Sequence, residues 1–347
     1  MEWRILLDAV CIVLIPLPQM EAVCVGTDCH ALRERSVRMK RKTNSTEHCP
    51  ENCVCNSSLR LIVDCSHKGL LEIPTQASAL QNASELFLDS NEIREIRSGL
   101  FSSMEWLNNL VLNRNRISTI ESGALEGLTN LLVLRLENNL IKHIPNNVFN
   151  RADVPELQYI DLSNNKLEII ESETFSNLTE LDVLYLNHNR ITYISQDAFK
   201  GLTKLSTLNL YDNSLTSAAW VVGLPSLQML NIGANLLKTL HTNILDSLYN
   251  IEFLNLEANP WICDQNLKLV YDALKVPGEI SCRNPRNLTQ RIKVADLSNE
   301  TLEMFTSAEK DTTHSQASAR LGQSQPPLVI IGICSGVVGL VRWSIVN

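Results

Sequence analysis

Four closely spaced cysteines are the residues whose chemistry is easiest to define from the sequence. They follow the spacing C-x3-C-x-C-x9-C, as Cys49, Cys53, Cys55 and Cys65. Thiolates at such spacing can bind zinc, and paired thiols can form disulfides. The segment has no C-x2-C pair and no histidines that would complete a zinc site, so disulfides are favoured and no metal or cofactor is expected. Because structural disulfides persist in oxidising compartments, the cysteines favour the secretory pathway.

The pair best suited to acid–base chemistry is His188 and Asp212, which could lie on neighbouring strands. No nucleophile with an oxyanion site accompanies them, and the other histidines are dispersed. The sequence also lacks a glycine loop that would cradle phosphate and an aspartate loop that would bind calcium. We therefore predict a solvated surface pair in a protein that is not an enzyme.

A regularly recurring asparagine marks the elements that position these residues. Successive asparagines are 24, 24, 26, 24, 24, 22 and 24 residues apart, and each closes the phrase L-x-x-L-x-L-x-x-N-x-L. A period in the twenties is typical of a solenoid of stacked units. The eight asparagines are Asn91, Asn115, Asn139, Asn165, Asn189, Asn213, Asn235 and Asn259.

Each phrase predicts a short strand with an apolar inner face. Leucines at phrase positions four and six point inward, because residues two apart in a strand share a face. The asparagine lies where the chain turns out of the strand, so its amide is expected to pair with backbone N–H and C=O groups that the bend would bury. The second half of each unit adds core anchors, namely Phe101, Phe149, Phe175 and Phe199 with Leu128, Leu178, Leu202 and Leu248.

Length and charge fit one elongated domain with additional terminal segments. Of the 347 residues, most are absorbed by eight full units. The formal net charge is −8, and no basic stripe runs through the repeats. A nucleic-acid partner is therefore not expected.

The repeats and their flanking segments resemble an extracellular leucine-rich repeat protein with 24-residue repeats. The string Cys49-Pro50 resembles the start of an amino-terminal cap, and Asn259-Pro260-Trp261-Ile262-Cys263-Asp264 resembles the start of a carboxyl-terminal cap. The resemblance covers residues 49 to 295. It implies an α/β solenoid, a horseshoe with a parallel β-sheet on its concave face and disulfide-stapled caps.

The same resemblance divides the chain into an amino-terminal cap at 49–78, eight repeats at 79–258 and a carboxyl-terminal cap at 259–295. In the first cap it implies bridges from Cys49 to Cys55 and from Cys53 to Cys65. Family members usually carry four cysteines in the second cap, whereas this chain has two. Both ends of one bridge are missing together, so a single bridge from Cys263 to Cys282 is expected.

Both ends of the chain carry segments expected to direct it through the secretory pathway. Residues 1–22 are predicted to be a signal peptide, and residues 23–48 a basic linker or a propeptide. Arg38-Met39-Lys40-Arg41 resembles a proprotein convertase site, and cleavage there would leave Lys42 as the first residue. Residues 296–327 resemble a polar stalk. The tail at 328–347 leaves three alternatives open, namely a glycosyl-phosphatidylinositol anchor signal, a short transmembrane segment and simple secretion.

Six N-x-S/T sequons predict glycan acceptors in a secreted chain. They are Asn44, Asn56, Asn82, Asn177, Asn287 and Asn299.

Function is expected on the exposed strand positions, because the variable residues of the phrase line the concave face. Tyr159, Tyr185 and Tyr211 occupy successive strands, each two positions further along, and so trace a diagonal across the sheet. Aromatic and charged side chains together are typical of a binding hot spot. Tyrosine also has a high propensity for strands, which is an alternative reason for its presence here. The predicted contact residues are Arg135, Tyr159, Asp161, Tyr185, His188, Tyr211 and Asp212.

This resemblance is found in particular with the variable lymphocyte receptors of jawless vertebrates and with the Nogo-receptor group. Those families imply recognition of a protein or glycan ligand on the concave face, in immune recognition or cell adhesion. The alternative is an extracellular-matrix structural protein similar to the small leucine-rich proteoglycans.

Overall fold

A computed structural model of the chain describes residues 48–56, 60–176, 178–248, 251–274 and 280–305. The predicted signal peptide, the proposed cleavage site, most of the predicted stalk and the hydrophobic tail lie outside these residues. In the part of the chain that is described, no helix is long and apolar enough to cross a membrane.

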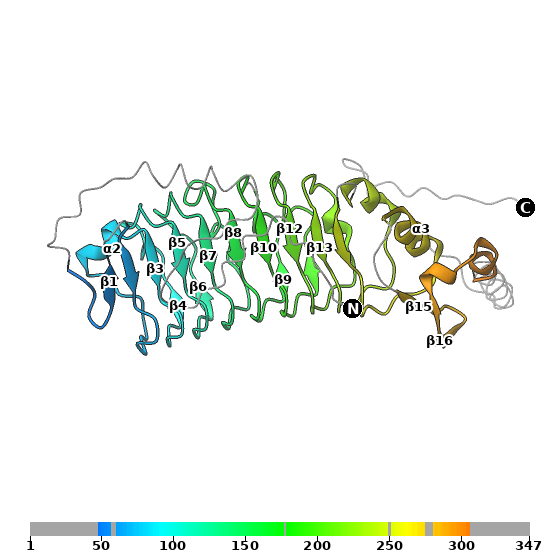
Figure 1. Ribbon diagram of the computed structural model, residues 1–347, viewed down its shortest axis with the longest axis horizontal. Helices are drawn as coiled ribbons and strands as arrows, with labels where there is room; N and C mark the ends of the chain where they lie inside the picture. The colour runs from blue at the N-terminus through cyan, green and yellow to red at the C-terminus, as the bar shows by residue number, and fades with distance from the viewer. Residues whose placement is uncertain (1–47, 57–59, 177, 249–250, 275–279, 306–347) are drawn as a thin grey trace, which may run out of the picture.

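Ten short strands form one sheet that runs the length of the repeats (Figure 1). Neighbouring repeat strands are parallel and in direct register, and only the first two strands pair antiparallel. The solenoid predicted from the repeated phrase is therefore confirmed. In spatial order the strands are β1 (Val54–Asn56), β2 (Ile62–Asp64), β3 (Glu85–Phe87), β5 (Asn109–Val111), β7 (Val133–Arg135), β8 (Tyr159–Asp161), β10 (Val183–Tyr185), β12 (Thr207–Asn209), β13 (Met229–Asn231) and β14 (Phe253–Asn255).

The recurring asparagines tie each repeat to the one before it. The Asn115 Nδ2 donates hydrogen bonds to the carbonyl oxygens of Leu88 in the preceding repeat, at 2.9 Å, and of Leu112, at 3.0 Å. Its Oδ1 accepts from the backbone N–H of Ile93 at 3.1 Å. The same bonding recurs at the other seven positions. The predicted role of the asparagines is confirmed.

The convex side of the stack is built from turns, short strand pairs and 3-10 helices. A column of buried aromatic rings runs beneath it, in which Phe149 stacks on Phe175 and Phe175 on Phe199, with ring centroids 5.2 and 6.1 Å apart. Trp220 continues the column at 5.8 Å from Phe199. The convex elements are β4 (Glu95–Ile96), β6 (Thr119–Ile120), β9 (Ile169–Ile170), β11 (Tyr193–Ile194), η1 (Ala219–Val221) and η2 (Thr242–Leu248).

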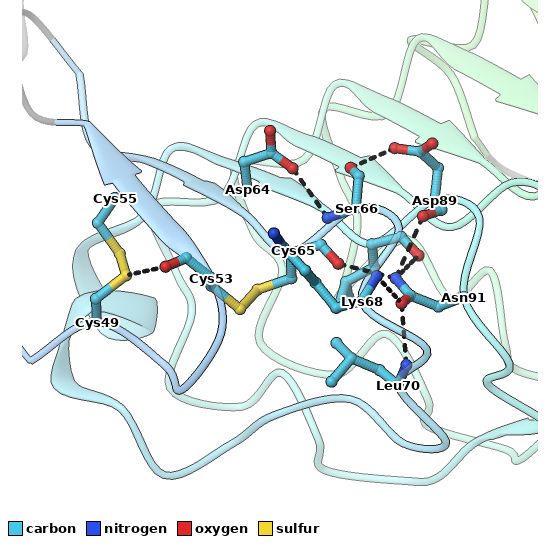
Figure 2. The surroundings of a disulfide bond; sticks show 11 residues. Cys49, Cys53, Cys55, Asp64, Cys65, Ser66, Lys68, Leu70, Asp89 and Asn91 are labelled. Carbon is cyan, nitrogen blue, oxygen red and sulfur yellow. Dashed lines mark hydrogen bonds between the residues drawn. A yellow bond between two sulfur atoms is a disulfide. The ribbon is translucent and has the colours of Figure 1, made fainter.

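The amino-terminal cap is held by two disulfides and by the first asparagine of the series (Figure 2). Cys49 is bonded to Cys55 and Cys53 to Cys65, which is the pairing that the resemblance implies. The Asn91 Nδ2 donates to the carbonyl oxygen of Cys65 at 2.9 Å, so the first repeat bonds to the cap as later repeats bond to one another. The short helix α2 (Ser78–Asn82) packs Leu80 into the core beside β3.

The carboxyl-terminal cap closes the other end of the core with one disulfide, between Cys263 and Cys282. The buried Trp261 donates its indole N–H to the carbonyl oxygen of Leu256 at 2.8 Å and so anchors the cap to the last repeat. The cap contains α3 (Gln265–Leu274), the hairpin of β15 (Ser281–Asn284) and β16 (Asn287–Lys293), and η3 (Val294–Asp296).

Candidate functional site

The concave face, as used here, is the sheet surface that points away from the core. It consists of the first and third residues of each repeat strand and the second and third residues after the strand, because the residue directly after the strand is buried in the core. The middle residue of each strand is buried while its neighbours are mostly half-buried. This alternation follows from the period of two in a strand. The face is therefore regular in backbone and variable in side chains.

Four of the predicted contact residues come together on β7, β8 and β10. Arg135 lies directly across from Asp161, and Tyr159 from Val183. The rings of Tyr159 and Tyr185 meet edge to face at 5.7 Å, and the Arg135 guanidinium lies 6.0 Å from the centre of the Tyr159 ring. Such edge-to-face and cation–π contacts each stabilise by about 1 kcal/mol. The cluster is thus held in a fixed geometry before any ligand arrives.

Both tyrosines in this cluster remain neutral hydrogen-bonding groups at physiological pH. Burial raises the pKa of Tyr159 well above its ordinary value, and the neighbouring Asp161 carboxylate raises it further. Burial also raises the pKa of Tyr185. The Tyr185 phenol can therefore donate a hydrogen bond to a ligand, and the Tyr159 oxygen can accept one, because its proton is directed to Asp161. Both rings supply apolar contact area.

Asp161 proves to have a structural task that the sequence analysis missed. It is only 7% exposed, and its Oδ1 accepts a hydrogen bond from the backbone N–H of Ser163 at 2.9 Å. Its Oδ2 lies 3.4 Å from the Tyr159 hydroxyl, which donates to it. The carboxylate therefore fixes both the turn after β8 and a tyrosine. The equivalent bond is accepted by Asn209, Asn231 and Asn255 from the N–H groups of Tyr211, Gly233 and Glu257.

The remaining predicted residues form a second, more exposed group. The His188 Nδ1 and the Asp212 Oδ2 are 2.8 Å apart, and the rings of His188 and Tyr211 meet at 5.7 Å. The side chains of His188 and Asp212 are 43% and 60% exposed, as a solvated surface pair should be. The diagonal of tyrosines is thus divided between two groups, because Tyr211 packs against a histidine.

The structure adds Asn109, Asn113 and Glu137 to the candidate site, none of which is among the contact residues predicted from the sequence. Among the described residues, five buried side-chain atoms lack a hydrogen-bond partner. Four of them lie on β5 and β7 or just beyond these strands, namely Asn109 Oδ1, Asn113 Oδ1, Arg135 Nε and Glu137 Oε2. A buried polar atom without a partner costs about 1 to 3 kcal/mol. A ligand that supplies partners here would recover part of that cost.

Glu137 carries the largest electrostatic penalty of this group. Its side chain is only 12% exposed, and its Oε1 lies 3.6 Å from the Arg135 Nε, too far for a good hydrogen bond. Burial raises the pKa of Glu137, the Asp161 carboxylate raises it further, and Arg135 and Arg114 lower it. The free protein thus holds a carboxylate that its own residues do not fully stabilise.

We expect Glu137→Gln to raise the free energy of unfolding at pH 7 by about 1 kcal/mol, since the amide removes a poorly stabilised buried charge. The pKa of Glu137 is higher in the folded than in the unfolded chain, so the wild type loses stability as pH rises through the folded pKa. The gain should therefore be present at pH 7 and should shrink below about pH 4, where both states hold the proton. Urea unfolding at the two pH values measures it.

The matched control for this prediction is Glu257→Gln, because Glu257 occupies the equivalent position in the last repeat and is exposed. It should change stability by less than about 0.5 kcal/mol. If the two variants behave alike at pH 7, Glu137 is adequately solvated in the free protein and the electrostatic argument is wrong.

The predicted glycan acceptors can be placed in part. Asn56 and Asn82 lie at the ends of β1 and α2, and Asn287 begins β16. Asn299 is exposed. Asn44 and Asn177 lie outside the described residues.

Comparisons with known proteins agree with this geometry. A family model described as a leucine rich repeat matches residues 81–141, 106–165, 129–191, 155–215 and 179–232. Keratocan of Gallus gallus is 31% identical over 228 residues, which cover 62% of this chain and 56% of keratocan. Leucine-rich repeat-containing protein 3 of Danio rerio is 35% identical over 119 residues, which cover 34% of this chain and 42% of that protein. The chain spans about half of the length of these relatives.

A solved structure shows the same fold. Human 5T4, also called Wnt-activated inhibitory factor 1 or trophoblast glycoprotein, matches with a TM-score of 0.53 and 22% identity. The match covers 75% of this chain and 99% of the 5T4 chain. At this identity the likeness concerns the fold alone.

Proposed function

The chain is a leucine-rich repeat protein with disulfide-stapled caps, and we propose that it binds an extracellular protein or glycan ligand on its concave face. The relatives and the disulfides fit an extracellular setting. Its role is recognition in immunity or cell adhesion, and not catalysis. The hydrophobic tail anchors it to the cell surface.

The observation that carries this proposal is the cluster of Arg135, Tyr159 and Tyr185 beside the unpaired polar atoms of Asn113 and Glu137. Tyrosine and arginine are enriched at the energetic centres of interfaces. Their rings are already packed, so binding would order few further side chains and would lose little entropy. The unpaired polar atoms add a free-energy gain that only an external group can supply.

Tyr159→Ala, Tyr185→Ala and Tyr211→Ala should show where the ligand binds. A binder is first selected by screening the immobilised protein against arrays of extracellular proteins and glycans. We expect at least one of the three substitutions to weaken that binder by about 2 kcal/mol, roughly 30-fold in Kd, because the lost ring contributes buried contact area. Surface plasmon resonance with purified variants measures the change.

The control is Tyr193→Ala, which removes an exposed tyrosine from β11 on the convex side. Its affinity should equal that of the wild type. Unchanged binding in all three concave variants would contradict the proposed contact centre.

A second candidate function is a structural role in the extracellular matrix. It is favoured by the keratocan similarity, since keratocan is a leucine-rich repeat protein of the small proteoglycan type and the match covers 62% of this chain. Membrane attachment separates the two candidates, because a matrix organiser has no need of an anchor. The full-length chain is therefore expressed in animal cells and treated with phosphatidylinositol-specific phospholipase C. Release from the surface supports a lipid-anchored receptor, and recovery only from the medium supports the matrix role.

A further inference from the structure

The hairpin of the carboxyl-terminal cap has a charge opposite to that of the whole chain. Between Ile280 and Lys293 the sequence contains Arg283, Arg286, Arg291 and Lys293 and no aspartate or glutamate, whereas the chain as a whole has a net charge of −8. This basic hairpin, formed by β15 and β16, belongs to the carboxyl-terminal cap and not to the repeats.

The two strands of the basic hairpin present their basic side chains on one face. Cys282 pairs with Ile292, and these two residues point toward the cap core, where Cys282 forms the disulfide. The alternate residues therefore point outward. They are Ser281 opposite Lys293 and Arg283 opposite Arg291, and all four are exposed.

Arg283 and Arg291 form a like-charged pair directly across the hairpin. Like charges in this position destabilise a two-stranded ribbon. Neither guanidinium has an ion-pair or hydrogen-bond partner among the described residues. Within the described part of the chain, the positive charge of this pair is thus not balanced by a direct contact.

Both arginines also line a hollow of about 630 Å³ between the hairpin and the last repeat. The turn from Glu257 to Trp261 forms the opposite wall of the hollow, and Ser281 of β15 also lines it. Among the described residues of the lining, one carboxylate, that of Glu257, faces two guanidinium groups. A negatively charged group in this hollow would reach both arginines at once.

We propose that the basic hairpin binds a sulfated polysaccharide, with a sulfate group held between Arg283 and Arg291. A sulfate has three terminal oxygens, so two facing guanidinium groups can each form two hydrogen bonds with it by sharing an oxygen. A carboxylate has only two oxygens and is satisfied by one guanidinium in the bidentate geometry. The hairpin therefore favours a sulfated chain over an acidic peptide. Lys293, two residues along β16, extends the basic face toward the next charge of such a chain.

The test measures affinity of the purified full-length protein for a heparin hexasaccharide at several salt concentrations. The double variant Arg283→Gln, Arg291→Gln is expected to bind at least tenfold more weakly at 0.15 M salt. The slope of log affinity against log salt should also become shallower by about 1 to 2, because fewer counterions are released. Enzymatic removal of N-glycans is included, since a glycan on Asn287 would stand beside the hairpin.

Three comparisons make the result decisive. The matched double variant Arg151→Gln, Arg190→Gln removes two exposed arginines of the repeats and should keep wild-type affinity. Tyr185→Ala should also keep it, so a failure here is independent of the concave-face proposal. The proposal is overturned if the hexasaccharide does not bind, if the hairpin variant binds like the matched variant, or if hexaglutamate binds as tightly as the hexasaccharide. Thermal unfolding shows whether the hairpin variant keeps its cap.

Discussion

Phe175→Ala should lower the free energy of unfolding by about 4 kcal/mol, which would be among the largest effects of any single substitution in this chain. Truncation of a buried phenylalanine loses its transfer free energy and leaves a cavity, at a typical cost of about 3 to 5 kcal/mol. Phe175 is fully buried and its ring lies between those of Phe149 and Phe199. It therefore loses contacts with two neighbouring repeats as well as its own.

The position of Phe175 in a stack makes the effect more than local. In a solenoid each unit is stabilised chiefly by its nearest neighbours. Removing the Phe175 ring weakens its contacts with Phe149 and Phe199, and so two successive interfaces between repeats. Chemical denaturation followed by circular dichroism should show a lower midpoint, and a broadened transition if the two halves of the stack separate.

The control is Phe253→Ala, because Phe253 is 43% exposed on the concave face. Its truncation should lower the free energy of unfolding far less, because a partly exposed ring has fewer packed neighbours to lose. Equal destabilisation by the two variants would show that the aromatic column does not couple the repeats.

Asn139→Ala should lower the free energy of unfolding by about 3 kcal/mol, although it removes only a small polar side chain. The Asn139 Nδ2 donates to the carbonyl oxygens of Leu112 and Leu136, both at 3.0 Å, and its Oδ1 accepts from the backbone N–H of Ile117 at 2.9 Å. Asn139 itself is buried. The alanine variant leaves the buried N–H of Ile117 without this partner, at about 1 to 3 kcal/mol. It also removes one of two donors from each carbonyl, since Asn115 and Asn165 also donate to Leu112 and Leu136.

Asn139→Asp tests the same bonds in another way. The carboxylate keeps an acceptor for Ile117 but loses both donors, and it places a charge where the asparagine was buried. The aspartate variant should therefore be at least as unstable as the alanine variant at pH 7. Its free energy of unfolding should recover partly when acid protonates the new carboxylate. The control, Asn146→Ala, removes an exposed asparagine of the same repeat. Comparable midpoints for Asn139→Ala and Asn146→Ala in urea would refute the proposed role of the asparagine series.

The repeat architecture could be predicted because the same physical requirement recurs about every 24 residues. Alternate leucines must face one way from a strand, and the bend after it buries backbone groups that an asparagine amide can satisfy. Both requirements are local, so the sequence pattern reveals them directly. The cap disulfides could be predicted for a different reason, because their cysteine spacing resembles that of a known class of protein.

The candidate sites were less predictable because they depend on contacts between repeats. The pattern placed Asp161 on the concave face, but it could not show that a backbone N–H donates to its carboxylate or that the Oε2 of Glu137 lacks a partner. Which ring Tyr211 would meet was also undetermined. In the cap, only the pairing of β15 with β16 places Arg283 opposite Arg291.

By itself, then, the sequence determined the solenoid, the face on which each side chain lies and the ends that need caps. The reason is that the position of a residue within the repeated phrase decides whether its side chain points into the core or toward solvent. The tertiary structure alone decided which polar groups on that face are satisfied and which are left for a ligand. The surroundings of these groups depend on side chains of the neighbouring repeats, as in the contacts of Tyr159 with Arg135 and with Tyr185. Those side chains differ from repeat to repeat while the backbone does not.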